Sequence, residues 1–215
     1  MDTGSHLSVK PAVAPDGWEV PAPMQERSRK TAERFVQAAL QLLREKTFAE
    51  LSVAELARKA DRSIGVFYQR FNSKDDFLHV LLSAYFREAL EWREAVPLEG
   101  QPAEIYTEIL ARRFRGVMEN RNLWHAALKR SASDPDFWKV YNSFRERAVE
   151  ITLQAMEATS GREFSEEERR RLAIAGQVFN SVINNQIINS PGPLCLEDED
   201  FLPELTRIAV DLAGL

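Results

Sequence analysis

Residues 52–74 read SVAELARKADRSIGVFYQRFNSK and contain two short helical patterns separated by a tight turn. Ser52 begins the first pattern, and Glu55 follows three residues later, as in a capping box. Ser63 can cap the second pattern, and Ser73 can cap the helix that comes next. This order predicts a helix-turn-helix, a motif whose second helix can lie in the major groove of DNA.

The two short helices need support from tertiary packing, because isolated helices of this length are marginal in water. An amphipathic helix that begins near Thr31 can give this support through apolar residues at spacings of three and four. We expect its apolar face to contain Ala32, Phe35, Val36, Ala39, Leu42 and Leu43. The side chains that pack on this face are predicted to be Leu56, Ala57, Ala60, Phe67 and Phe71.

The charge distribution favours a nucleic-acid partner for this segment, although the whole chain has a net charge of -5. Residues 27–74 contain eleven Lys and Arg against five Asp and Glu, so the remainder of the chain is acidic. A basic segment on an acidic body is expected of a DNA-binding head. The acidic body should face away from the phosphates.

Residues 27–86 resemble the N-terminal domain of TetR-family transcriptional regulators. The resemblance is carried by residues 51–57, 60–68 and 71–74, and by the spacing of Ser63, Gly65, Tyr68, Phe71 and Lys74. It implies a homodimer with a DNA-binding head and a variable helical body that binds a small ligand. Repression is the common mode of the family, and a twofold dimer implies an inverted-repeat target in double-stranded DNA.

By this resemblance, Ser52, Tyr68 and Lys74 contact phosphates. Val66 stands where the family often has threonine, so a hydroxyl contact is lost and a thymine methyl contact becomes available. Asp61 stands where glycine is frequent in the family.

The expected outer face of the motif supplies further contacts to DNA. Gly65 lets the backbone approach closely, because it has no side chain. The residues expected to choose the sequence are Arg62, Gln69 and Arg70. Additional contacts to the DNA backbone or the minor groove are expected from Ser63, Arg27, Arg29 and Lys30. Capping alone would also explain the serines, and Tyr68 and Arg70 could instead be a packing residue and a solvated surface charge.

The rest of the chain shows helical patterns without convincing strand alternation, which predicts an all-α fold of about nine or ten helices. We expect a disordered arm over residues 1–25, a helix-turn-helix DNA-binding domain over 26–76, and a helical ligand-binding and dimerisation domain over 77–215. Asp134 and Pro135 predict the start of a long helix that ends at Gly161.

A second long helix is predicted to begin at Ser165, which three glutamates follow. By the family resemblance, the helices that begin near Asp134 and Ser165 form the dimer face. Small and apolar residues on the second of them, Ala173, Gly176 and Val182, would permit close approach.

The body is rich in aromatic residues, which suit a small apolar or aromatic ligand but also suit an ordinary core. The candidate ligand-binding residues are Trp92, Phe114, Trp124, His125, Tyr141, Phe179 and Asn180. Such a ligand would release DNA by favouring a body conformation that separates the two heads. A DNA-binding regulator without small-molecule control is the alternative.

An enzyme is disfavoured, because the chain has none of the common nucleotide-binding, esterase or metalloprotease motifs. Its histidines, His6, His79 and His125, have no metal-ligand spacing, so neither a metal nor another cofactor is expected. The single Cys195 fits a reducing cytoplasm, and no stretch is apolar enough for a membrane span. A helical enzyme remains the least favoured alternative.

Overall fold

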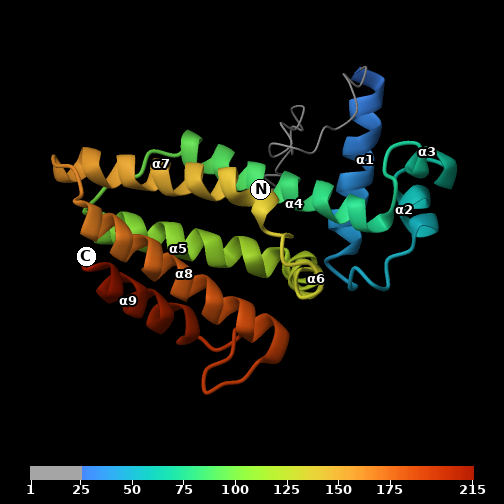
Figure 1. Ribbon diagram of the computed structural model, residues 1–215. Coiled ribbons are helices and arrows are strands. Elements are labelled where there is room, and N and C mark those ends of the chain that lie inside the picture. Colours follow the sequence, from blue (N-terminus) through green and yellow to red (C-terminus); the bar gives the residue numbers. More distant parts are fainter. Residues whose placement is uncertain (1–25) are drawn as a thin grey trace, which may run out of the picture. The chain divides into compact units, whose positions relative to one another are not determined.

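The computed structural model describes residues 26–215, with side chains from Arg29 onward, and the predicted arm over residues 1–25 lies outside this range. The described residues form nine α-helices and one short 3-10 helix, with no strand, which confirms the all-α prediction (Figure 1). The helices are α1 (Glu26–Leu42), α2 (Val53–Lys59), α3 (Ile64–Tyr68), α4 (Lys74–Ala95), α5 (Pro102–Glu119), α6 (Arg121–Ser131), the 3-10 helix η1 (Lys139–Tyr141), α7 (Asn142–Ser160), α8 (Glu166–Asn189) and α9 (Phe201–Ala213).

The described residues pack as two compact units that do not follow a single cut in the sequence. The first unit contains residues 26–88 and 122–143, and the second contains residues 89–121 and 144–215. The first unit therefore combines the helix-turn-helix with α6 and η1. The boundary expected after residue 76 concerns function rather than packing, and it stays a prediction.

Four phenylalanine rings form the centre of the helix-turn-helix. Phe67 of α3 is fully buried, and its ring centroid lies 5.4 Å from that of Phe35 on α1 and 5.3 Å from that of Phe77 on α4. Phe71 completes the cluster, 4.9 Å from Phe67 and 4.6 Å from Phe77. Edge-on and tilted ring contacts of this kind stabilise beyond simple burial. One residue of α3 is thus held by both longer helices.

The predicted serine caps are confirmed, but the capping box at Ser52 is only half formed. The Ser52 hydroxyl accepts a hydrogen bond from the backbone N–H of Glu55 at 3.1 Å. The Glu55 carboxylate does not return to Ser52, because it accepts from Lys46 Nζ at 2.6 Å. Ser63 caps α3 in the same way, through the N–H of Val66 at 3.3 Å. Each short helix therefore begins at the residue that the sequence predicts.

The helix expected to begin at Asp134 does not form there. Asp134 Oδ1 accepts from the backbone N–H of Asp136 at 3.1 Å, a local turn that competes with helix formation. The chain then continues through turns and η1, and α7 begins only at Asn142. The irregular backbone lets Phe137 and Tyr141 be buried together in the first unit, where Tyr141 Oη lies 2.7 Å from His79 Nδ1 on α4.

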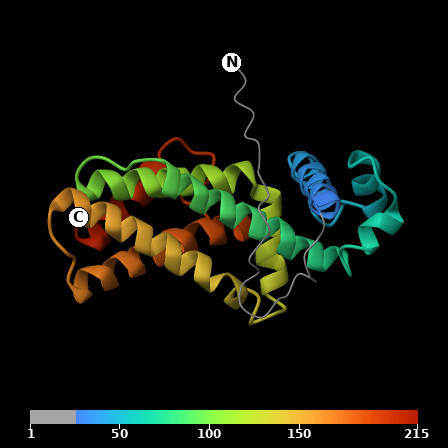
Figure 2. The same ribbon diagram turned by 90° about the horizontal axis from the view of Figure 1, so that it is seen from above.

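In the second unit, α8 and α9 pack along each other, and α9 also packs against α5 (Figures 1 and 2). The N-terminus of α8 has a complete capping box, since Ser165 and Glu168 each bond to the other's backbone N–H. Deeper in the unit, Tyr106 is nearly buried, and burial raises the pKa of its hydroxyl to about 12. None of the described helices is long and apolar enough to cross a membrane.

We expect Phe67→Ala to lower the free energy of unfolding by about 3–5 kcal/mol, because it removes the ring at the centre of the cluster. Ile64→Ala on the same helix is the matched control, and it should change stability by less than about 0.5 kcal/mol because Ile64 is exposed. Urea titration of the full chain measures both. Equal losses for the two variants would contradict the assigned role of Phe67.

The α8 capping box should make stability depend on pH. The hydrogen bond from Arg162, followed by those from Ser165, lowers the pKa of Glu168 to about 2 from its ordinary 4.5. A carboxylate with a lowered pKa stabilises the fold above about pH 4.5, and this stability is lost as the pH falls toward 2.

Glu168→Gln cannot titrate, so its thermal midpoint should lie below that of the wild-type protein at pH 6, and the difference should close as the pH approaches 2. Circular dichroism melting curves across this range measure the difference. A gap that stays constant with pH would show that the Glu168 charge has no such role.

Candidate nucleic-acid interface

One face of α3 is exposed while the opposite face is buried. Ile64 is 47% exposed and Tyr68 is 54% exposed, and Gly65 and Gln69 are exposed beside them. These residues have the spacing i, i+1, i+4 and i+5, which places them on one side of a helix. Phe67 points into the core on the other side. The exposed face of α3, defined by these four residues, is the surface that a groove could receive.

The turn before α3 keeps its shape although aspartate stands where the family often has glycine. Asp61 has a φ of +54°, in the left-handed region. The N–H of Arg62 donates to Ala57 O at 2.9 Å, and the N–H of Asp61 donates to Arg58 O at 3.2 Å. This pair of bonds is a Schellman ending for α2, and aspartate tolerates the left-handed conformation better than most residues. The turn therefore needs no glycine.

Two of the residues expected to choose the sequence are partly engaged by the protein itself. Arg62 Nη1 donates to Asp61 O at 2.5 Å and lies 3.6 Å from Asp61 Oδ2. Arg70 is half-buried with its Nε enclosed by protein, and burial, followed by the nearby charge of Arg62, lowers the pKa of its guanidinium. Gln69 is the most open of the three. Their roles in DNA reading stay predictions.

Lys74 is the first residue of α4 and links that helix to the loop before α2. Its Nζ donates to Ala49 O at 3.2 Å and lies 4.8 Å from the ring centroid of Phe48. Burial lowers the pKa of the Lys74 ammonium. An ammonium has three protons, so the bond to Ala49 leaves donors for a phosphate oxygen. The predicted phosphate contact is compatible with this packing.

The three hydroxyls expected at the phosphates differ in their surroundings. Ser52 and Ser63 accept from backbone N–H groups as caps, and each keeps a proton to donate. The ring of Tyr68 lies edge-on to Phe67 with centroids 5.4 Å apart, while the residue as a whole is largely exposed. Val66 is half-buried.

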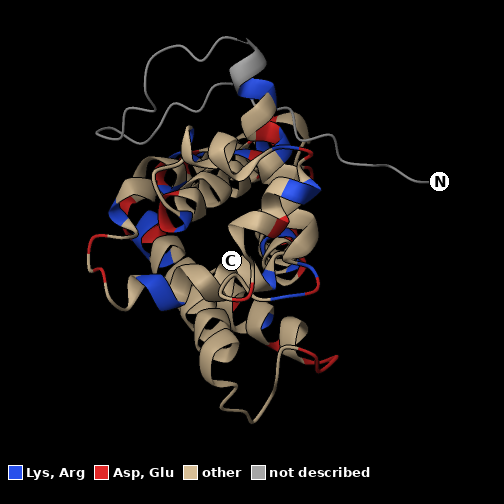
Figure 3. Ribbon diagram, turned by 90° about the vertical axis from the view of Figure 1, so that its right-hand side faces the viewer, with Lys and Arg blue, Asp and Glu red and all other residues tan. Residues whose placement is uncertain are grey.

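The basic residues at the start of α1 form the remaining part of the candidate interface. Arg29 Nε lies 3.8 Å from a carboxylate oxygen of Glu33, and Lys30 is exposed. The side chain of Arg27 lies outside the described residues. Figure 3 colours the Lys and Arg residues of the described ribbon blue and the Asp and Glu residues red. The predicted DNA contacts of Arg29 and Lys30 stay predictions.

Ile64 was missed as a candidate, although the apolar residue Val66 of the same helix was included. Its place four residues before Tyr68 could have revealed it, since residues at this spacing share a face. An apolar residue at the start of the exposed face of α3 is therefore part of the candidate interface.

The candidate ligand-binding residues are divided between the two units. Trp124, His125 and Tyr141 lie in the first unit, whereas the second unit contains Trp92, Phe114, Phe179 and Asn180. Tyr141 and Phe179 are fully buried in packing, and the ring of Trp124 contacts those of Tyr85, Phe86 and Trp138. Phe114 contacts Phe201, and Trp92 lies under the guanidinium of Arg112. Tyr141 and Phe179 are thus core residues, and the ligand-binding role of the seven candidates stays a prediction.

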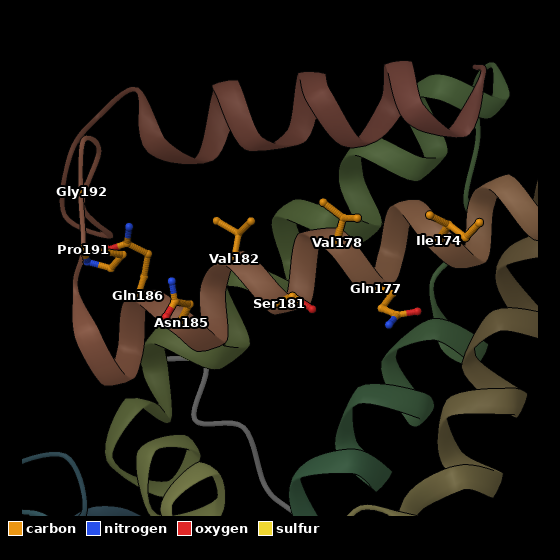
Figure 4. A pocket seen from close by; sticks show the side chains of 9 residues that line it. All are labelled: Ile174, Gln177, Val178, Ser181, Val182, Asn185, Gln186, Pro191 and Gly192. Atoms are coloured by element: carbon orange, nitrogen blue, oxygen red, sulfur yellow. The ribbon is translucent and has the colours of Figure 1, made fainter. Parts of the chain in front are cut away.

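A groove of about 500 Å³ lies instead along α8, and none of the seven candidates lines it. Its side chains follow one side of α8 from Ile174 toward the loop at Pro191 and Gly192 (Figure 4). The residues between these ends are Gln177, Val178, Ser181, Val182, Asn185 and Gln186. Sequence reasoning missed this groove, although residues 172–196 contain no Asp, Glu, Lys, Arg or His.

A sequence profile described as "Bacterial regulatory proteins, tetR family" matches residues 35–81. An uncharacterised HTH-type transcriptional regulator of Bacillus subtilis, YwcC, is 41% identical over 58 residues, which are 27% of this chain and 26% of that protein. The match thus spans about a quarter of the length of YwcC.

Solved structures resemble the chain over most of its length. A TetR-family regulator from Mesorhizobium loti has a TM-score of 0.64 at 16% identity, covering 88% of this chain and 96% of that one. The regulator FadR of Bacillus subtilis, solved with stearoyl-CoA, has a TM-score of 0.56 at 18% identity, covering 84% and 96%. Likeness at this identity shows the fold. The profile match shows that residues 35–81 are similar to the corresponding segment of TetR-family regulators.

Proposed function

We propose that the protein reads DNA through the exposed face of α3, as a homodimer on an inverted repeat, and acts as a repressor. The profile that matches residues 35–81 is that of a family of bacterial regulatory proteins, which supports this proposal. The observation that carries the proposal is that α3 has one buried face and one exposed face. Phe67 is buried in the core, while Ile64, Gly65, Tyr68 and Gln69 are exposed to solvent. A helix anchored in this way can enter a major groove without losing its packing.

The expected contacts divide into two kinds. Ser52, Tyr68 and Lys74 would fix the position of the head by bonding to phosphates, which carry no sequence information. Arg62, Gln69 and Arg70 would contact base edges, and both arginines would have to leave part of their present packing to do so. Arg29 and Lys30 would add charge at the backbone.

The pair α8 and α9 is the surface that we propose for the dimer. Exposed apolar side chains gather on it, namely Ile174 and Ile188 on α8 and Ile208 and Leu212 on α9, each 40–46% exposed. The exposed side of α8 also includes the groove, whose lining has no charged residue. Depletion of charge with exposed apolar groups is typical of the core of a protein interface. The sequence-based expectation paired α8 with α7 instead, and that choice stays open to test.

We propose that a twofold dimer contributes two copies of α3, one for each half-site. Recognition helices on such dimers contact half-sites about one helical turn apart, roughly 34–36 Å. The proposed target is therefore an inverted repeat. Separately, we propose that the protein is located in the cytoplasm.

Release by a small apolar ligand is supported by the aromatic body and by the fold shared with FadR, which was solved with stearoyl-CoA. A ligand can change DNA affinity only by as much as its own affinity differs between the two body conformations. The complete burial of Tyr141 and Phe179 favours the second candidate, a regulator without small-molecule control. If the DNA affinity is the same with and without a demonstrably bound ligand, the protein is a regulator without small-molecule control.

Lys74→Gln tests the phosphate contact. Glutamine can keep a hydrogen bond to Ala49 O but has no charge, so binding should weaken for all DNA sequences. The slope of log K against log salt should become shallower by about 0.9 for each protomer. Fluorescence anisotropy over a salt series measures the slope.

Lys129→Gln on α6 is the matched control for Lys74→Gln, because it removes the same charge from an exposed position of the first unit. Its salt slope should equal that of the wild-type protein. Equal slopes for Lys74→Gln and the wild-type protein would refute the phosphate contact.

Ile174→Asp tests the dimer surface by placing a charge in the groove on α8. We expect a shift to monomer in sedimentation velocity and a loss of DNA affinity of at least tenfold, since burying an unpaired carboxylate is costly. Val149→Asp on α7 is the control, because Val149 is 45% exposed in the same unit. A monomeric Val149→Asp beside a dimeric Ile174→Asp would assign the interface to α7.

A further inference from the structure

Ile64 is the first residue of α3 and one of the few large apolar side chains that the described part of the chain leaves exposed. A single exposed apolar residue is ordinary on a protein surface. Its position is informative here, because residues near the N-terminus of a recognition helix contact base edges in this class of motif. The proposal that follows rests on the proposed DNA binding.

The backbone beside Ile64 is unusually open. A Cβ atom built on Gly65 would meet only Ser63 Oγ, at 3.8 Å, so no side chain stands above the helix at this point. The major groove of DNA can therefore approach the backbone of α3 closely. Under that approach, the Ile64 side chain projects beyond the helix, while Tyr68 lies one turn further along the same face.

The chemistry of α3 narrows what its exposed face can recognise. The helix sequence IGVFY contains no charged residue and no side-chain amide, and the amide of the exposed face belongs to Gln69, which follows the helix. Apolar groups at the floor of the major groove are the C5-methyl groups of thymine. Val66 was the residue expected to meet such a methyl, but it is half-buried and less exposed than Ile64. Ile64 is the exposed aliphatic residue of the helix.

We propose that Ile64 reads the methyl group of a thymine in each half-site. Contact with this methyl removes apolar surface of both groups from water, and it discriminates thymine from the other bases without a hydrogen bond. The neighbouring Gly65 supplies the close approach, and Tyr68 supplies the phosphate bond that fixes the depth of the helix.

Replacement of thymine by uracil tests the contact, because uracil pairs identically and lacks only the methyl. Half-sites are first obtained by selecting bound sequences from random DNA with the full chain. Each selected thymine is then changed to uracil, one at a time, and binding is measured by fluorescence anisotropy. We expect about a fourfold loss of affinity at one thymine per half-site, equal to the ~0.8 kcal/mol of one buried methyl group.

Ile64→Ala should bind the thymine and uracil versions of that site equally, and Ile64→Val should retain part of the discrimination. Both variants should keep the wild-type thermal midpoint, since the residue is exposed and alanine favours helix. Val66→Ala is the matched control and should preserve the full discrimination.

Three results would overturn the assignment. Discrimination that survives in Ile64→Ala but disappears in Val66→Ala would move the contact to Val66. Equal binding of every thymine and uracil version by the wild-type protein would exclude methyl reading altogether. Failure to select any DNA sequence would instead refute the proposed DNA binding, together with the inference that rests on it.

Discussion

The ring of Phe67 is fully buried among Phe35, Phe71 and Phe77, and this contact makes a five-residue helix possible. A helix as short as α3 has too few internal hydrogen bonds to persist in water by itself. It persists because its one buried residue is held by α1 and α4 together. The orientation of the exposed face of α3 therefore follows from the packing of a single aromatic side chain.

The ends of α3 are fixed by different means. Its N-terminus depends on the Ser63 cap and on the left-handed conformation of Asp61, which ends α2 in a Schellman motif. Beyond its C-terminus, Phe71 belongs to the aromatic cluster, and Lys74 begins α4 while bonding to Ala49. The backbone hydrogen bonds of the turn are satisfied locally. The residues on the exposed face of α3 are consequently available to contact a DNA duplex.

The sequence predicts the helix-turn-helix well because caps and apolar spacing are local signals. Ser52, Ser63 and Ser73 each accept a hydrogen bond from a backbone N–H three residues later, as expected. The reading at Asp134 was wrong because a capping residue followed by proline also suits a turn, and the burial of Tyr141 against His79 decides between the two. Burial of that kind depends on residues far apart in the chain.

Candidate DNA contacts could be predicted more fully than candidate ligand contacts in the body, because the signals in the head are local in sequence. The head is a short segment in which spacing nearly determines exposure, and only Ile64 was overlooked there. The body places aromatic residues in two separate units, so composition alone could not tell a binding site from a core. The groove on α8 is recognisable only when the exposed side of a long helix is known.

Selection of bound sequences from random double-stranded DNA by the full chain tests the central claim most directly. The account predicts strong enrichment of an inverted repeat whose half-site centres lie about one helical turn apart, roughly 34–36 Å. It also predicts that the enrichment disappears when Phe67 is replaced by alanine, because α3 then loses its anchor. Absence of any enriched sequence from the wild-type protein would contradict the account, as would enrichment that Phe67→Ala leaves unchanged.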